Sequence, residues 1–534
     1  MPDPTYPALV QYVVLPTQGL RAHTNDSSPG VRRYLSELAA YTQGERLAST
    51  MADHLEYPRA LAAPGARVSA AASVSAMAFT SAAASAALGL RVVDSIHDDG
   101  AKLIEIDPEH LPALRALQPG LRFVPIAFYK PALAPRLAPH VEVRARPHAA
   151  RAATATTLKV VSKTDGTPID GATVIAFTDF AARTGVQGVT NKKGEVRLAV
   201  SGRTPLDRLY VYPVNGYWSA LRKKFTPLAG ATIPLIPLAL DYTDGVRFFY
   251  GSAADNSGAG VTVGVVDTGI ATNHPDLTVQ GGVNTVVGED QTAFGDNGHG
   301  HGTHVAGIIA ARGQPPKGIR GLAPGVTLRS YRVFARGAET ASNYSIAKAI
   351  DRALTDGCDL INLSLGGGEP DDVLRAAVED ARTQGALVIV AAGNDDHGPV
   401  NFPASDAMAI AVSAMGRKGT YPNDATEAGE AAKPYGKDRK NFIAAFSNIG
   451  LDVDLTAPGV GILSCFPGGY AALSGTSMAC PAVTGMAAQR LAAEAHILSM
   501  PRDGARSEAM ARLILGAAQS LGFGPQYEGR GMIR

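Results

Sequence analysis

Residues 473–481 read LSGTSMACP, and the Ala-rich run Met486–Ile497 follows them. We predict that Ser477 lies at the start of a buried helix, where unpaired backbone N–H groups and the positive end of the helix dipole favour an anion. Pro481 suits the first turn of that helix, because the N–H that proline lacks would have no partner there. Such a serine either caps the helix or attacks a carbonyl whose oxyanion the backbone donors receive. A histidine and a carboxylate in matching contexts would decide between the two.

From about Gly251 onward, apolar strands alternate with helical patterns. The first strand, Val261–Val266, reads VTVGVV and is apolar at nearly every position. This alternation predicts an α/β fold with a doubly wound parallel sheet, covered by helices on both faces. Further strands are expected at Thr327–Phe334, Leu360–Leu363, Ala386–Ala391 and Ala409–Ala414, and helices at His301–Ala311, Tyr344–Thr355 and Asp371–Gln384. Ligands bind such sheets at the carboxyl ends of the strands.

Three polar groups fall at such positions. Asp267 ends the first strand and either caps a turn or orients a histidine. His301 begins a helix within GHGHGTHVAG, where it serves as a catalytic base or, with His299 and His304, as a metal ligand. We favour the base, because no thiolate or HExxH glutamate lies nearby. Asn394 ends the strand LVIVAAGN and is either a turn residue or an amide donor to an oxyanion.

Seven motifs occur in a fixed order in this half of the chain. They are VVDTGI, HGTHVAG, INLSLGG, AAGN, FPAS, LTAPG and GTSMA. Together they resemble the subtilisin family of serine peptidases over residues 245–534, and the order Asp, His, Ser is the one known for subtilisin.

The resemblance implies a role for each matching residue. Asp267 would orient His301, the general base, and Ser477 would be the nucleophile. Asn394 and the Ser477 N–H would form the oxyanion hole. Substrate would pair with Ser364, Leu365 and Gly366. Gly393 and Phe402–Ser405 would line the specificity pocket, and His304 would be a structural histidine.

The chain departs from the family at two places. Ala482 follows Pro481 where relatives have a histidine outside the triad, which leaves the activity expected. Asp276 matches a calcium ligand of some relatives, but the partner loop, residues 312–320, reads RGQPPKGIR and offers no carboxylate. We therefore expect no cofactor; calcium at Asp276 is the alternative, which the loop sequence does not support, and Asp276 otherwise caps a turn.

Residues 1–133 predict a small α+β domain with an Ala/Ser-rich segment. Its expected elements are strands at Val10–Leu15, Leu90–Val93, Ala101–Ile106 and Leu121–Tyr129 and helices at Gly30–Thr42 and Pro108–Leu117. The element order resembles a subtilisin propeptide, which implies that this region inhibits its own enzyme. The uncharged run Val68–Leu90 could span a bilayer by length, but its Ala/Ser composition favours a small-residue helix or linker.

Residues 134–156 predict a linker, and residues 157–240 a β-sandwich. Short β-type runs separated by TDG, NKKG and NG turns support the latter. It resembles carboxypeptidase-regulatory-like or Ig-like domains, and Trp218 is expected to be a core residue rather than a platform for a ligand. A cut before this module would leave it on the mature enzyme, and a cut near Asp241–Asn256 would remove it.

The composition narrows the function classes. The net charge of +1 gives no electrostatic case for nucleic acid or membrane as partners. Three scattered cysteines, Cys358, Cys465 and Cys480, predict buried thiols rather than disulfides. The first residues lack a signal-peptide pattern, so a cytoplasmic location is favoured over secretion. We expect polypeptide substrates and a self-processed zymogen; the alternative is a non-catalytic protein-binding scaffold on a protease fold.

Overall fold

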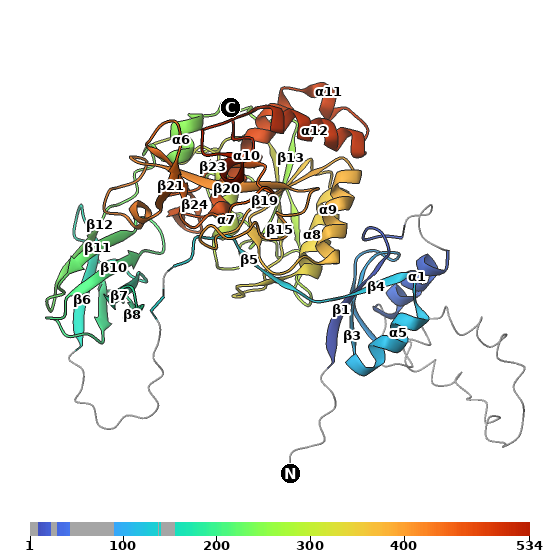
Figure 1. Ribbon diagram of the computed structural model, residues 1–534, viewed down its shortest axis with the longest axis horizontal. Coiled ribbons are helices and arrows are strands. Elements are labelled where there is room, and N and C mark those ends of the chain that lie inside the picture. The colour runs from blue at the N-terminus through green and yellow to red at the C-terminus, as the bar shows by residue number, and fades with distance from the viewer. Residues whose placement is uncertain (1–8, 23–28, 43–89, 137, 140–154) are drawn as a thin grey trace, which may run out of the picture.

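The computed structural model describes residues 9–22, 29–42, 90–136, 138–139 and 155–534. It has three parts: an N-terminal unit, a β module and a large α/β domain between them (Figure 1). All of the Ala/Ser-rich run except Leu90 lies outside the described residues. Among the helices that are described, none is long and apolar enough to cross a membrane.

The N-terminal unit is an antiparallel sheet with helices on one face. Its strands have the order β2-β3-β1-β4. The elements are β1 (Val10–Pro16), α1 (Pro29–Thr42), β2 (Arg91–Ser95), β3 (Lys102–Ile106), the 3-10 turn η2 (Pro108–His110), α5 (Leu111–Leu117) and β4 (Leu121–Pro125). Tyr34 and Leu38 of α1 pack on Val14 and Ile104 of the sheet. The opposite face, which includes Val13, packs against the α/β domain. Alternate strand residues thus serve two different cores.

The strand predicted over Leu121–Tyr129 is wrong in one respect, because the chain forms two strands there. After β4 the chain leaves the N-terminal sheet and forms β5 (Phe128–Pro131), which pairs with two short strands of the α/β domain, β16 (Ala341–Ser342) and β18 (Leu365–Gly366). Figure 1 shows β5 crossing from one part to the other.

The β module, Thr156–Leu235, consists of two packed sheets. Their orders are β11-β10-β7-β8 and β12-β6-β9. The strands are β6 (Thr156–Ser162), β7 (Thr173–Asp179), β8 (Thr184–Val189), β9 (Glu195–Leu198), β10 (Leu206–Tyr212), β11 (Ala220–Phe225) and β12 (Thr232–Leu235). Alternating residues such as Val174 and Leu209 fill the space between the sheets. The sequence analysis missed β8 and β11, where glycine and lysine interrupt the β-type pattern.

The α/β domain contains the predicted parallel sheet, which confirms the α/β fold class. Its order is β14-β15-β13-β17-β19-β20-β22-β21, with β23 also on β20. The bounds are β13 (Thr262–Asp267), β14 (Gly282–Asn284), β15 (Thr327–Arg332), β17 (Leu360–Leu363), β19 (Leu387–Ala391), β20 (Ile410–Arg417), β21 (Ala431–Tyr435), β22 (Asn441–Ala444) and β23 (Leu455–Pro458). Only the pairs that involve β22 are antiparallel. The central strands β13, β17, β19 and β20 are buried on both faces, as their continuous apolar runs predict.

Helices cover the two faces of this sheet. On one face lie α7 (His301–Ala310) and α10 (Thr476–Ala492), and on the other α8 (Asn343–Thr355) and α9 (Asp372–Thr383). The remaining elements are α6 (Gly245–Tyr250), the 3-10 turn η3 (Thr426–Gly429), β24 (Ile462–Phe466), β25 (Gly469–Leu473), α11 (Ala495–Leu498), α12 (Gly504–Gly516), β26 (Ala518–Gln519), α13 (Pro525–Glu528) and β27 (Met532–Ile533). Helix α10 is buried over most of its length, so its first residues are surrounded by the core of the domain.

Candidate active site

The carboxyl ends of three neighbouring parallel strands carry the polar groups of the site. Asp267 ends β13, Ser364 follows β17, and Asn394 lies beyond the end of β19. These strands are adjacent in the order β13-β17-β19, so their ends lie side by side along one edge.

Asp267 and His301 form a buried pair. The Nδ1 atom of His301 lies 2.7 Å from Oδ1 of Asp267, and both residues are fully buried. The same oxygen accepts a hydrogen bond from the Thr268 N–H at 2.7 Å. A carboxylate on Nδ1 fixes the ring orientation and leaves Nε2 as the basic atom. Nε2 is buried and has no hydrogen-bond partner.

The loop before His301 is shaped by Asp296, a residue that the sequence analysis missed. Its carboxylate accepts hydrogen bonds from the N–H groups of Gly298 and Gly300, at 2.8 and 2.9 Å. Gly300 has a φ of 81°, which glycine adopts without strain, and directly precedes α7. Burial raises the pKa of Asp296. The sequence signal for this loop was the pattern DNGHG, in which an acid is followed by glycines whose N–H groups can donate hydrogen bonds to it.

Ser477 is the second residue of α10, after Gly475 and Thr476, and it does not cap the helix. Its Oγ donates to the Ser364 carbonyl at 2.9 Å. The expectation that Pro481 lies in the first turn is wrong, because it lies inside α10. The Ser477 carbonyl, which an N–H at position 481 would bond in a regular helix, accepts instead from Ser364 Oγ at 3.0 Å. Two reciprocal hydrogen bonds thus hold the start of α10 against the end of β17.

Asn394 lies beside this helix start. Its Oδ1 accepts from the Thr476 N–H at 2.9 Å. Because the oxygen is occupied, the side-chain NH2 remains available as a donor. Gly393 contacts the same threonine, whose Oγ1 accepts from the Gly393 N–H at 3.2 Å.

A segment of the same chain passes directly beside Ser477. In β5, Pro131 pairs with Leu365 and Lys130 with Gly366 in an antiparallel register. The next residue, Ala132, donates its N–H to the Ser364 carbonyl at 3.0 Å, and its carbonyl accepts from the Ser477 N–H at 3.1 Å. Of the predicted substrate-binding residues, Ser364, Leu365 and Gly366 therefore bind this strand. The buried Phe402 borders the same region, because its carbonyl accepts a hydrogen bond from the Gly367 N–H at 3.1 Å.

Comparisons with known proteins agree with this geometry. The model of the subtilase family, Peptidase_S8, matches residues 258–529. The chain belongs to the subtilase family. The resemblance found from the seven motifs is therefore confirmed.

This subtilase is similar to several bacterial proteases. It is 42% identical over 234 residues to M-protease of Shouchella clausii (strain KSM-K16) and to subtilisin Savinase of Lederbergia lenta. The match covers 43% of this chain, 54% of M-protease and 76% of subtilisin Savinase. An alkaline protease of Alkalihalobacillus alcalophilus matches at the same identity, over 54% of its length. The chain thus spans about half the length of M-protease and of this alkaline protease.

The other histidines of the motif do not join His301 in a ligand set. His304 is buried, and its Nε2 lies 3.0 Å from the Ile462 carbonyl and 3.1 Å from the Ala471 carbonyl. Burial lowers its pKa to about 3. His299 is exposed. His304 therefore fastens the β24–β25 hairpin to α7 of the subtilase.

Asp276 is satisfied by hydrogen bonds from the protein. Its Oδ2 accepts from the Ile319 N–H at 2.7 Å and from the Tyr470 hydroxyl at 2.9 Å. Its side chain lies close to those of His274 and Cys465. Among the residues that the structure describes, these three form the one cluster of three potential metal-ligating side chains. Both His274 nitrogens are engaged, with the Gly469 carbonyl and the Asp276 N–H. This donor set therefore does not fit a calcium ion.

Cys480 lies three residues after Ser477 in α10. It is fully buried, and its thiol contacts the Ile389 carbonyl and Asn362 Oδ1 at 3.3 Å. Burial raises its pKa. A protonated, inaccessible thiol is unreactive, so Cys480 fills space beneath the helix start.

Proposed function

We propose that this subtilase is a serine endopeptidase that first cleaves its own chain between Ala132 and Leu133. One observation carries the proposal: the Ala132 carbonyl accepts a hydrogen bond from the N–H of Ser477 at the start of α10. A carbonyl in this position has its carbon next to the serine and its oxygen at an oxyanion donor. The buried Asp267–His301 pair supplies the base that such a serine needs.

The chemistry follows the roles that the residues can play. Ser477 Oγ turns from the Ser364 carbonyl toward His301 Nε2, which accepts its proton while Oγ attacks the Ala132 carbonyl carbon. Asp267 stabilises the resulting imidazolium, and the Ser477 N–H and the Asn394 amide hold the oxyanion. The proton then passes from His301 to the Leu133 nitrogen as the peptide bond breaks. Water hydrolyses the acyl-enzyme at Ala132 by the same route, and other polypeptides later follow this path.

The N-terminal unit is, in this proposal, an intramolecular inhibitor. Support comes from its two contacts: β5 fills the substrate position, and the apolar face of the N-terminal sheet packs on the α8–α9 face of the domain. After the cut, the unit is held only by non-covalent contacts and can be released. No cofactor takes part in these steps.

Mass spectrometry and N-terminal sequencing test the proposal directly. The purified protein should yield a fragment that begins at Leu133, and a fluorophosphonate probe should label Ser477 of the product. Ser477→Ala should remain one chain and stay unlabelled. Ser364→Ala is a useful comparison, because it removes a side chain that bonds the helix start but keeps the nucleophile.

Failure has a clear form. A wild-type protein that keeps its full length, and resists the probe even after a nick in residues 133–155 by a second protease, would contradict the peptidase proposal. The protein would then be better described as a binding scaffold on a protease fold.

A further inference from the structure

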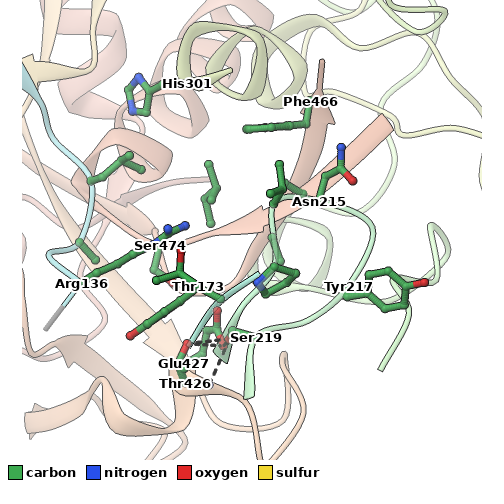
Figure 2. Close-up of a pocket in the computed structure, with 18 of the residues that line it drawn as sticks. Arg136, Thr173, Asn215, Tyr217, Ser219, His301, Thr426, Glu427, Phe466 and Ser474 are labelled. Carbon is green, nitrogen blue, oxygen red and sulfur yellow. Dashed lines mark hydrogen bonds between the residues drawn. The ribbon is translucent and has the colours of Figure 1, made fainter. Parts of the chain in front are cut away.

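A cavity lies beside His301, between the β module and the α/β domain (Figure 2). Its volume is about 520 Å³. The catalytic domain contributes His301, Phe466 and the residues Ala471–Ser474, and the β module contributes Tyr212, Asn215 and Tyr217. The cavity is therefore built by two parts of the chain that are far apart in sequence.

The chain that follows the proposed scissile bond runs into this cavity. The residues Leu133, Ala134, Pro135 and Arg136 lie along it. The Ala134 N–H donates to the Ser474 carbonyl at 2.9 Å, which continues the backbone pairing past Ala132. The cavity thus receives the leaving-group side of a bound polypeptide.

The β module forms a fixed wall of this cavity. Trp218 is 1% exposed, belongs to the core of the α/β domain and packs edge-on against Tyr242 at 5.1 Å. Ser219 Oγ donates to Glu427 Oε2 at 2.8 Å, and the Gly216 N–H donates to the Tyr470 carbonyl at 2.8 Å. Figure 2 shows the Ser219 contacts as dashed lines. A wall anchored by a buried indole and by hydrogen bonds to the α/β domain holds its shape when a ligand binds.

The wall presents the face of the Tyr212 ring to the guanidinium group of Arg136. The guanidinium carbon of Arg136 lies 4.9 Å from the centre of the Tyr212 ring, within the range of a cation–π contact. Tyr210 stacks on Tyr212 at 6.1 Å with an angle of 5° between the rings, which fixes the orientation of the face.

Two acids, Glu427 and Glu430, line the cavity together with Arg136 and the histidines. Burial, Glu427 and Asp396 raise the pKa of Glu430 to about 7. A cation that binds in this cavity would stabilise the charged form of these acids.

We propose that the β module is the leaving-group wall of the substrate cleft and selects a cationic side chain four residues after the scissile bond. Arg136 is that residue in the chain's own sequence. The preferred substrates are accordingly polypeptides with arginine or lysine at this position. This inference rests on the proposed peptidase function and adds a substrate class to it.

Quenched fluorescent peptides test the inference on the self-cleaved enzyme, which retains the β module. The parent peptide has the sequence FYKPALAPR of residues 128–136. Its partner carries citrulline, a neutral isostere, in place of the last arginine, and a lysine peptide serves as the conservative replacement. We expect kcat/KM to be about 3- to 30-fold higher for arginine than for citrulline, mostly through KM, with lysine between them.

Variants of the wall provide the second comparison. Tyr212→Leu should bring the arginine-to-citrulline ratio close to one, whereas Tyr212→Phe should keep it, because phenylalanine retains the ring face. Glu430→Gln should lower the ratio, and Glu195→Gln, in the β9 strand away from the cavity, should leave it unchanged. The ratio compares two peptides on one enzyme sample, so it does not depend on how much of a variant is folded.

The two proposals fail in different ways. Equal kcat/KM for the arginine and citrulline peptides on the wild-type enzyme overturns the selective wall while leaving the peptidase function intact. An Arg/citrulline ratio that survives in Tyr212→Leu also overturns it. If no peptide is cleaved at all, and the fluorophosphonate probe does not react, the peptidase function itself fails.

Discussion

Gly475 packs against the proposed scissile strand at the start of α10, and replacing it gives the sharpest test of that placement. Gly475 has a φ of 152° and a ψ of 161°, a conformation that residues with a side chain rarely adopt. A Cβ added there would lie 2.6 Å from the Ala132 carbonyl oxygen and 3.0 Å from the Ala134 nitrogen. Gly475→Ala therefore combines backbone strain with a collision against the strand.

The two effects have different magnitudes and act on different observables. The strain costs about 1–3 kcal/mol of folding stability, with or without a bound strand. An ordinary contact is 3.4 Å, so the Ala132 oxygen would have to move by about 0.8 Å. A similar stretch of its 3.1 Å hydrogen bond to the Ser477 N–H would break that bond. Losing one oxyanion donor slows acyl transfer about 10²–10³-fold, a value measured in a subtilisin.

The assay follows the appearance of the fragment that begins at Leu133, by quenched time points and intact mass, together with the melting temperature. Gly468→Ala is the matched control: it also has a positive φ, 75°, but its added Cβ meets nothing within 4 Å. We expect both variants to melt at lower temperature and only Gly475→Ala to lose self-cleavage. If Gly475→Ala cleaves within threefold of Gly468→Ala, the strand does not pass Ser477 as described.

Three further predictions concern Asp267, His304 and calcium. Asp267→Asn should lower kcat by about 10⁴-fold with little change in KM, since an amide on Nδ1 favours the wrong tautomer of His301; kcat within tenfold of wild type would contradict this role. The pKa of His304 is about 3 in the folded protein and about 6.5 in the unfolded chain, so only the unfolded chain binds a proton at this residue as the pH falls below 6.5. The free energy of unfolding should therefore drop by about 2 kcal/mol between pH 7.5 and pH 5 because of this residue. Urea titrations at both pH values measure it, and His304→Gln should show a smaller drop than wild type. Excess EDTA should leave the melting temperature unchanged, because Asp276 already accepts hydrogen bonds from Ile319 and Tyr470; a fall that added calcium reverses would refute this.

The central sheet and the positions of its polar groups could be predicted because both depend on local sequence. A strand buried on both faces must be apolar throughout, as in Val261–Val266, so a polar residue such as Asp267 marks its end. Parallel strands align these ends at one edge, which brings the candidate residues together without any knowledge of loops.

The path of residues 121–136 could not be predicted in the same way. Its apolar pattern is compatible with one long strand, and local residues give no sign that Phe128–Pro131 pairs with strands more than 200 positions later. The position of Pro481 inside α10 has a similar cause. The cost of its missing N–H is offset by Ser364 Oγ, which donates to the freed carbonyl from another element. Long-range partners decided both cases.

The structure also bears on which part of the chain the mature enzyme keeps. The start of the alternative cleavage region, Asp241–Asn256, is held in the fold. Asp244 is fully buried, caps α6 through the Arg247 N–H and accepts from the Leu463 N–H at 2.8 Å. A peptide bond held in this way is not free to enter an active site as an extended strand, whereas the exposed residues after α6, such as Asp255 and Asn256, are not restrained by this contact. Removal of the β module would also expose the site in the α/β core that Trp218 fills. We therefore expect the mature enzyme to comprise residues 133–534 with the β module attached, and an intact mass that corresponds to a start after residue 241 would show that the module is discarded.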